Sequence, residues 1–189
     1  APDAVVEQYL AGFSAEDQEI VEGRRRRIRG QRWGTKEIEL VDVRFLDGQG
    51  RERSSFVTGE PFRVQMSYVA HKRIANPVFG MAFHSGEGAW INGSNTMTSG
   101  QDIDWVEGSG RVTYCVDSLP LLKGSYLFTA VVYDHSRSIP RAYDHLDKAF
   151  LVQVQPSEQI RETLGMMYIP CRWEHERGDE VAPDLRGGV

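Results

Sequence analysis

From Lys36 onward, apolar and polar residues alternate in short segments that turn-forming residues interrupt about every 8 to 12 positions. Such alternation is typical of strands that bury one face and expose the other. About eight short strands and no convincing internal helix predict an all-β fold, an antiparallel β-sandwich of two sheets. The predicted strands include residues 38–46, 61–70, 78–84, 89–93, 111–116, 125–133 and 149–154.

The same alternation predicts which side chains face the core. Those expected inside include Val41, Val43, Phe45, Phe62, Val64, Met66, Phe79, Met81, Phe83, Val112, Tyr114, Tyr126, Phe128, Ala130, Val132, Phe150, Val152 and Val154. A glycine two positions before Tyr126, at a strand start, matches the tyrosine corner of many immunoglobulin-like sandwiches. Tyr126 is either this corner or a plain core aromatic, and both roles are structural.

The two ends of the chain follow other patterns. Residues 1–13 place apolar side chains at helical spacing behind Asp3, which predicts a short N-terminal helix. Residues 14–34 are charged and contain glycine, which favours a linker. Further on we expect one helical turn at 158–164, a short strand at Met166–Ile169 and a frayed tail. The predicted division is therefore 1–34, 35–156 and 157–189.

Length and charge limit the function classes. The 189 residues suffice for one well-cored domain with extensions, and the net charge of -5 argues against nucleic acid as a partner. Six of the 22 basic residues nevertheless fall between Arg24 and Arg32. This run is either a solvated linker or a contact for lipid head groups or pyrophosphate.

Cysteine usage and the apolar stretches bear on the cellular compartment. Cys115 and Cys171 are too few for a disulfide-dependent secreted domain, so we expect free thiols in a reducing compartment. No stretch approaches the roughly 20 apolar residues that span a bilayer, and the first residues do not match a signal peptide. We therefore expect a cytoplasmic location.

Few residue patterns point to catalysis. The sequence has no phosphate-binding G-x-x-x-x-G-K-[ST] loop, no G-x-S-x-G elbow, no H-E-x-x-H and no zinc-site cysteine spacing. Asp134-His135, at a strand end, could converge with Asp144-His145 and Asp147 into a metal or acid–base site, or these could be polar loop residues that cap turns. We expect no catalysis, no metal and no cofactor.

Aromatic and amide residues gather around the middle strands. Trp90, Asn92 and Asn95 lie in one strand and its loop, and Trp105 follows two aspartates in the next loop. Sugars present apolar C–H faces and hydroxyls, so their sites combine an aromatic platform with hydrogen-bonding side chains. Trp90 is either such a platform or a core residue.

Several motifs occur in a fixed order along residues 36–155. They are TGEPF from Thr58, NPVFGM from Asn76, NGSNT from Asn92, LPLLKGSY from Leu119, VYDH from Val132 and YDH from Tyr143. Together they resemble the Wzt C-terminal domain, which is fused to the ATP-binding subunit of bacterial ABC transporters that export O-antigen polysaccharide. The opening residues are similar to the last helix of the ATPase domain in such subunits.

The resemblance implies an immunoglobulin-like sandwich that recognises the exported polysaccharide and forms a homodimer, in some members by exchanging a C-terminal strand. It also implies action with the ATPase domain and the membrane permease at the inner face of the inner membrane. The expected carbohydrate-binding residues are Trp90, Asn92, Asn95, Tyr133, Asp134, His135, Tyr143, Asp144 and His145. The tail at Cys171–His175 departs from the family's pattern.

Two other functions stay open at this point. An exposed apolar row could be the interface of a structural dimerisation module that binds no sugar. Asp134 and Asp144 could be the two carboxylates of a glycan hydrolase, provided that they face each other across a cleft.

Overall fold

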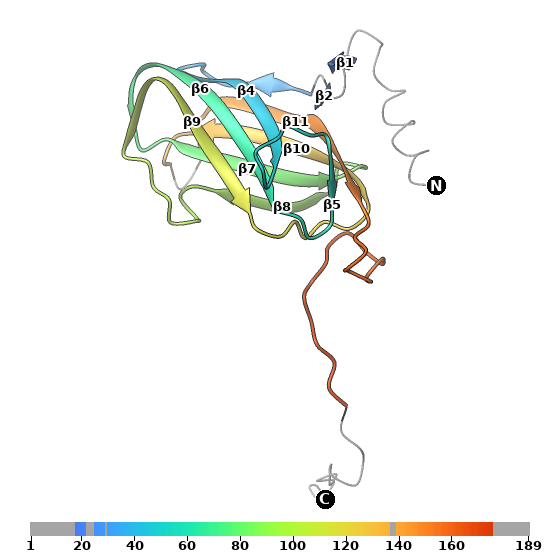
Figure 1. Cartoon of the computed structure of the whole chain (residues 1–189). Helices are drawn as coiled ribbons and strands as arrows, with labels where there is room; N and C mark the ends of the chain where they lie inside the picture. The colour runs from blue at the N-terminus through green and yellow to red at the C-terminus, as the bar shows by residue number, and fades with distance from the viewer. Residues whose placement is uncertain (1–17, 22–24, 29, 137–138, 176–189) are drawn as a thin grey trace, which may run out of the picture.

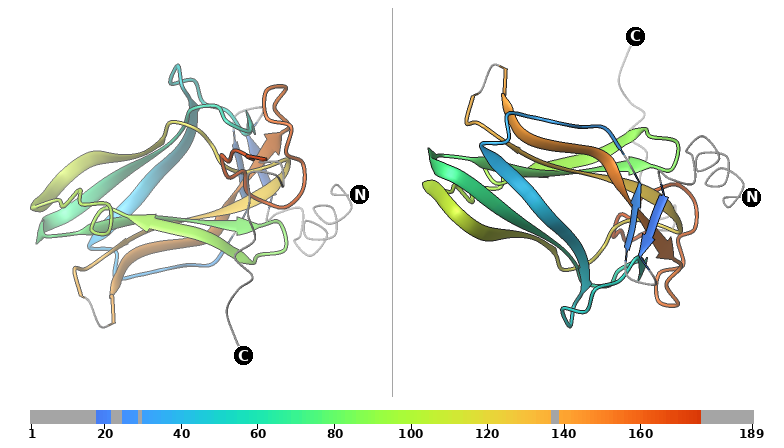
Figure 2. Two further views of the ribbon diagram at one scale, coloured as in Figure 1. Left: turned by 90° about the horizontal axis from the view of Figure 1, so that it is seen from below. Right: turned by 90° about the horizontal axis from the view of Figure 1, so that it is seen from above.

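The computed structural model describes residues 18–21, 25–28, 30–136 and 139–175, and the regular secondary structure in these ranges is β. Two sheets pack face to face, as Figure 1 and the further views in Figure 2 show. The predicted all-β, two-sheet sandwich is thereby confirmed. The predicted helix at residues 1–13 lies outside the described residues.

The larger sheet contains eight strands and the smaller sheet three. The large sheet consists of β1 (Gln18–Val21), β2 (Arg25–Ile28), β3 (Arg32–Trp33), β5 (Ser55–Val57), β7 (Val78–Ser85), β8 (Trp90–Asn95), β10 (Gly124–Tyr133) and β11 (Ala142–Gln155). The small sheet consists of β4 (Ile38–Asp47), β6 (Phe62–Ala75) and β9 (Trp105–Val116). The strand orders are β1-β2-β11-β10-β7-β8, with β3 and β5 also paired to β11, and β4-β6-β9. The pairing of β5 with β11 is parallel.

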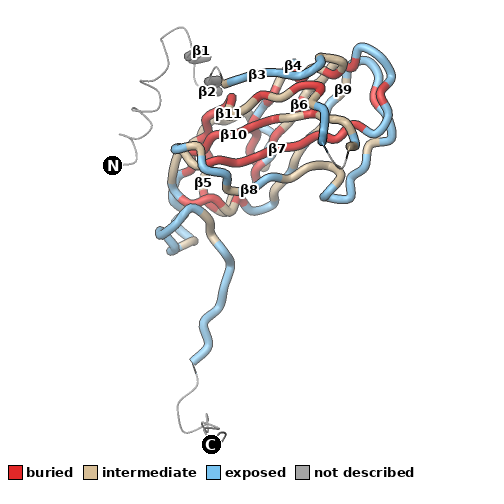
Figure 3. Tube along the Cα trace, turned by 180° about the vertical axis from the view of Figure 1, so that it is seen from behind, coloured by how far each residue is buried: buried red, intermediate tan, exposed pale blue. Residues whose placement is uncertain are grey.

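The core lies between the inner faces of the two sheets. Phe128, in the middle of β10, is fully buried, and its ring lies 4.8 to 5.7 Å from those of Phe45, Phe62 and Phe83. Figure 3 shows buried residues along β7, β10 and β11. Phe79, Met81 and Phe83, the row on β7, belong to this core. That row is therefore a structural feature and not an exposed interface.

Val41 is an exception to the predicted core. The register of β4 against β6 shifts between Leu40 and Asp42, which is a bulge or irregularity in the ladder. Val41 is 58% exposed, whereas Leu40 and Val43 are buried. The prediction that Val41 faces inward is wrong, because an extra residue in one strand interrupts strict alternation.

Two strands begin earlier than the alternation predicts. β9 starts at Trp105, where it pairs with the far end of β6. β11 starts at Ala142 and therefore includes Tyr143, Asp144 and His145, which were expected in a loop. In β11 the polar side chains of Asp144 and Asp147, which have their own structural partners, hide the alternation. Residues 158–164 do not form the predicted helical turn.

Tyr126 forms a tyrosine corner. Its hydroxyl lies 2.7 Å from the carbonyl oxygen of Leu122 and 3.1 Å from that of Met166, and burial raises its pKa to about 12. The neighbouring Met167 pairs with Leu121 of the same chain through an isolated bridge. The segment expected to be a late strand is therefore reduced to this one bridge, which holds it against the corner.

The two cysteines of the chain, Cys115 and Cys171, are exposed free thiols, as predicted. In the part of the chain that the structure describes, no helix is long and apolar enough to cross a bilayer. Residues 30–34, part of the expected linker, lie along β11, where Trp33 pairs with His145, and the backbone N–H of the next residue, Thr35, donates to the carbonyl oxygen of Ala142.

Candidate functional site

The outer face of the large sheet, which is turned away from the small sheet, carries four of the nine predicted site residues. Residues that alternate with core residues along a strand point to this face. The register with β7 and β10 shows that four predicted site residues point to the outer face: Trp90 and Asn95 on β8, Tyr133 on β10 and His145 on β11. The order β11-β10-β7-β8 brings these distant parts of the chain onto one surface.

Trp90 is the most exposed aromatic residue of this face, at 67%. Its ring lies over Gly93, because a β-carbon at position 93 would come within 2.3 Å of ring atom Cζ2. The ring also meets His84 in an edge-on arrangement, with centroids 5.2 Å apart and planes at 85°. Gly93 and His84 therefore orient an indole whose remaining surface is open to solvent.

Asn95, the last residue of β8, and Tyr133, the last residue of β10, supply polar groups at the end of β8 opposite Trp90. Burial raises the pKa of the Tyr133 hydroxyl, and a side-chain hydrogen bond with Asn95 acts in the opposite direction. The amide oxygen of Asn95 also accepts the backbone N–H of Thr98 at 2.8 Å. The phenol is therefore protonated at neutral pH and can donate to or accept from a sugar hydroxyl.

A polar network, buried at His84 and Thr129, lies beneath Trp90. Nε2 of His84 is 3.1 Å from Oγ1 of Thr129, which is 3.2 Å from Oδ1 of Asp147. The backbone N–H of Lys148 donates to the same hydroxyl at 2.9 Å. Burial, and then the charge of Lys148, lowers the pKa of His84. The imidazole that supports Trp90 is consequently neutral at pH 7.

Trp33 stacks on His145 on the same face. The two ring planes are inclined by only 16°, with centroids 3.9 Å apart, and Trp33 is 45% exposed. Burial lowers the pKa of His145, while the charge of Asp147 acts in the opposite direction. An exposed indole on a neutral imidazole is thus a second aromatic surface.

Two predicted site residues are turned away from the outer face. Tyr143 is 6% exposed and belongs to the core. The fully buried carboxylate of Asp144 accepts hydrogen bonds from Nη2 of Arg32 at 2.6 Å, from Lys36, and from the backbone N–H of Leu40 at 2.8 Å. These bonds connect β11 to β4 of the other sheet, so we leave both residues out of the proposed binding surface.

The remaining three predicted residues lie apart from this surface. Asn92 is exposed, but it pairs with the core residue Phe83, so its side chain points to the opposite side of the sheet from the outer face. Oδ1 of Asp134 accepts two backbone N–H groups of its own loop, at 3.0 and 3.2 Å. His135 lines a separate cavity of about 270 Å³. Asp134 and Asp144 therefore hold separate structural contacts, which gives no support to a hydrolase that uses both.

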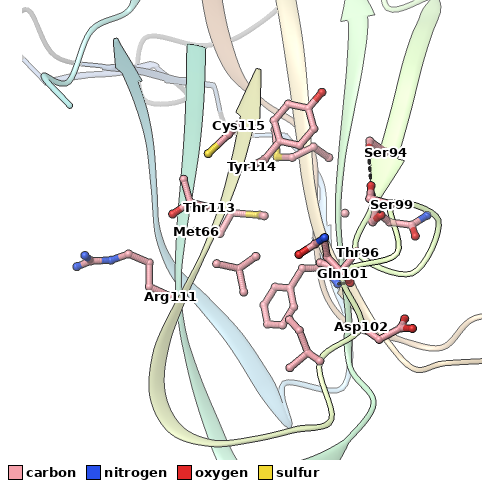
Figure 4. A pocket seen from close by; sticks show the side chains of 16 residues that line it. Met66, Ser94, Thr96, Ser99, Gln101, Asp102, Arg111, Thr113, Tyr114 and Cys115 are labelled. Atoms are coloured by element: carbon pink, nitrogen blue, oxygen red, sulfur yellow. Dashed lines mark hydrogen bonds between the residues drawn. The ribbon is translucent and has the colours of Figure 1, made fainter. Parts of the chain in front are cut away.

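A cleft of about 570 Å³ opens between β8 and β9, the edge strands of the two sheets. Figure 4 shows Met66 at its apolar floor and Ser94, Ser99 and Gln101 at its polar side. The hydroxyls of Ser94 and Ser99 are 3.2 Å apart. Asn95 also lines the cleft, so its rim adjoins the outer face. In the described residues no three His, Cys, Asp or Glu side chains are placed to hold a metal ion.

Sequence reasoning missed Trp33, His84, Thr129 and Lys148 on the outer face. Trp33 falls in the segment assigned to a linker, and its pairing with β11 is non-local. His84 and Thr129 carried a usable signal, because both are polar residues at outward positions of otherwise apolar strands. Buried polar residues at such positions need partners, and these two bond to each other.

These features define a class: an immunoglobulin-like β-sandwich with an aromatic and polar outer face on its larger sheet. Residues 29–169 match the family model described as the Wzt C-terminal domain. The chain therefore belongs to the Wzt C-terminal domain family, whose members are known as carbohydrate-binding domains of ABC transporters.

Solved structures support the fold. The crystal structure of the C-terminal domain of Wzt is similar with a TM-score of 0.70 and 15% identity, over 78% of this chain and 89% of that one. A cellulose-active polysaccharide monooxygenase from M. thermophila (TM-score 0.33, 12% identity, 54% and 53% coverage) and a CARDB domain from Pyrococcus furiosus (0.35, 10%, 65% and 97%) are too dissimilar to carry an argument. No curated protein sequence matches the chain.

Proposed function

We propose that the chain is a non-catalytic domain that binds O-antigen polysaccharide for export by an ABC transporter, through the outer face of the large sheet. The observation that carries the proposal is the exposed indole of Trp90, held over Gly93 and against His84. An exposed aromatic ring with amide and hydroxyl groups nearby suits a sugar, whose C–H face stacks while its hydroxyls form hydrogen bonds.

The family supports a wider arrangement, which we also propose. The domain would act with an upstream ATPase domain, to which residues 1–34 would connect, and with a membrane permease. Its location would be cytoplasmic, at the inner face of the inner membrane. The sandwich would comprise residues 35–156 and the extension residues 157–189.

Substitution of Trp90 by leucine tests the proposal. We expect the affinity for the source bacterium's own O-polysaccharide to fall on the order of tenfold, because one stacked sugar face buries apolar area worth roughly 1 to 1.5 kcal/mol. The matched control is Trp105→Leu, which removes a 48% exposed indole from the small sheet. Isothermal titration calorimetry measures both, and equal affinity in wild type and Trp90→Leu would contradict the site.

A structural dimerisation role is a second candidate, favoured by the C-terminal extension. Leu164, Ile169 and Trp173 are 84%, 69% and 94% exposed. Exposed apolar side chains along one segment are typical of an interaction surface. We propose that this extension contacts a second copy of the chain, with or without a bound glycan.

Light scattering after size-exclusion chromatography tests that candidate. The double substitution Ile169→Asp and Trp173→Asp should convert a dimer into a monomer at micromolar concentration, because charge in an apolar contact is unfavourable. The control is Val41→Asp, at an exposed apolar position of the small sheet. A wild-type monomer, or an unchanged dimer in the variant, would exclude the extension as the contact.

A further inference from the structure

The Trp33–His145 pair is held in place by the segment that carries it. The backbone N–H of Asp147 donates to the carbonyl oxygen of Gln31, and that of Lys36 donates to Tyr143. Gly30 and Gly34 pass so close to β11 that a β-carbon would lie 2.0 and 2.3 Å from its carbonyl oxygens. The stacked indole is therefore fixed before any ligand arrives, which lowers the entropic cost of binding.

The strand register gives the separation of Trp33 from Trp90. A row of paired residues runs from Trp33 through His145, Val131 and Gly80 to β8, which is four strand spacings of about 4.8 Å. Trp90 pairs with His84, four residues of about 3.3 Å further along β7. The two tryptophans thus lie roughly 23 Å apart on one face, a span of several sugar rings.

The surface between the two tryptophans combines small or apolar residues, Val131, Gly80 and Ala82, with polar groups. It contains the network of His84, Thr129, Asp147 and Lys148, of which the side chains of Asp147 and Lys148 are 29% and 30% exposed. Their carboxylate and ammonium groups lie 3.4 Å apart and can each bond to sugar hydroxyls. Two aromatic platforms joined by polar groups suit an extended chain better than a single ring.

We propose that the outer face binds a segment of several sugar residues, stacked on Trp90 at one end and on Trp33–His145 at the other. This inference rests on the proposed glycan-binding function and specifies its ligand as a stretch of polymer. Trp33, His145 and Lys148 are then binding residues. Affinity depends on chain length until a fragment reaches both platforms, because the second contact becomes intramolecular once the first is made.

The test uses size-fractionated oligosaccharides from partial hydrolysis of the source bacterium's own O-polysaccharide, titrated into the 189-residue chain. We expect wild-type affinity to rise from disaccharides to fragments that span both platforms. Trp33→Leu should lose that gain, on the order of tenfold for the long fragments, while binding disaccharides normally. Trp33→Tyr should keep most of the gain, since it retains an aromatic face, and Trp105→Leu should behave as wild type.

The outcomes separate this inference from the proposed function. If Trp90→Leu weakens all fragments while wild type and Trp33→Leu bind long fragments equally, the second platform is wrong and glycan binding stands. Wild-type affinity that is independent of length also overturns the inference. If no fragment binds the folded wild type, both proposals fail. His145→Leu provides an independent variant should Trp33→Leu unfold, and it should show the same selective loss for long fragments.

Discussion

Substitution of Asp144 by alanine should lower the free energy of unfolding by about 3 kcal/mol, because it removes the buried carboxylate that accepts charge-assisted hydrogen bonds from Arg32 and Lys36. The carboxylate is fully buried and also accepts the backbone N–H of Leu40 at 2.8 Å. Alanine would leave that amide of the opposite sheet without this acceptor as well. The loss should appear as a lower denaturant midpoint with an unchanged slope.

The pH dependence gives this prediction a second readout. Burial alone would raise the pKa of Asp144, but hydrogen bonds from Arg32, Lys36 and Leu40 outweigh it and lower the pKa. A lowered pKa in the folded state stabilises the fold above the unfolded-state value, near 4, and this contribution is lost as the pH falls through the folded-state value. Asp144→Asn should therefore remove part of the acid sensitivity of the wild type.

The control for Asp144 is Glu37→Ala. Glu37 pairs with Lys72 and Arg141, whose side chains are 62% and 56% exposed. Exposed ion pairs contribute about 0 to 1 kcal/mol, so this variant should stay close to wild type. Equal losses in Asp144→Ala and Glu37→Ala would mean that the buried carboxylate does not connect the two sheets as described.

Substitution of Phe128 by alanine should cost about 4 kcal/mol, within the range for removing a fully buried aromatic ring. The ring contacts Phe45 and Phe62 of the small sheet and Phe83 of the large sheet, so its loss opens a cavity between the sheets. Chemical denaturation measures the change, with Leu164→Ala as an exposed control. A loss below about 1 kcal/mol would contradict the placement of Phe128 in the core.

Much of the fold could be predicted because the central strands bury one face each. In β10, Phe128, Ala130 and Val132 alternate with outward residues, and the structure keeps that order. Alternation fails where side chains have specific partners: Asp144 is polar yet buried, and it hid the first half of β11. The bulge at Val41 likewise depends on pairing with β6, which local pattern does not encode.

The shared face of the candidate site could not be predicted from local pattern. Trp90 and Asn95 are five positions apart on one strand, which strict alternation would place on opposite faces, and they share a face because the register of β8 against β7 shifts between Phe83 and His84. Trp33 joins that surface through pairing with His145, 112 positions later, which no local pattern reveals. Tyr143 and Asp144 were included because their motif resembles the family's, yet a motif does not state which way each side chain points.

The most direct test of glycan binding uses the four tryptophans as separate reporters. Trp33, Trp90, Trp105 and Trp173 each give one indole N–H signal in a ¹H–¹⁵N NMR spectrum, which single substitutions assign. Titration with the source bacterium's O-polysaccharide should shift the signal of Trp90, and with long fragments that of Trp33, while Trp105 and Trp173 stay in place. A Trp90 signal that does not move at saturating glycan, or shifts confined to Trp105 or Trp173, would contradict the account.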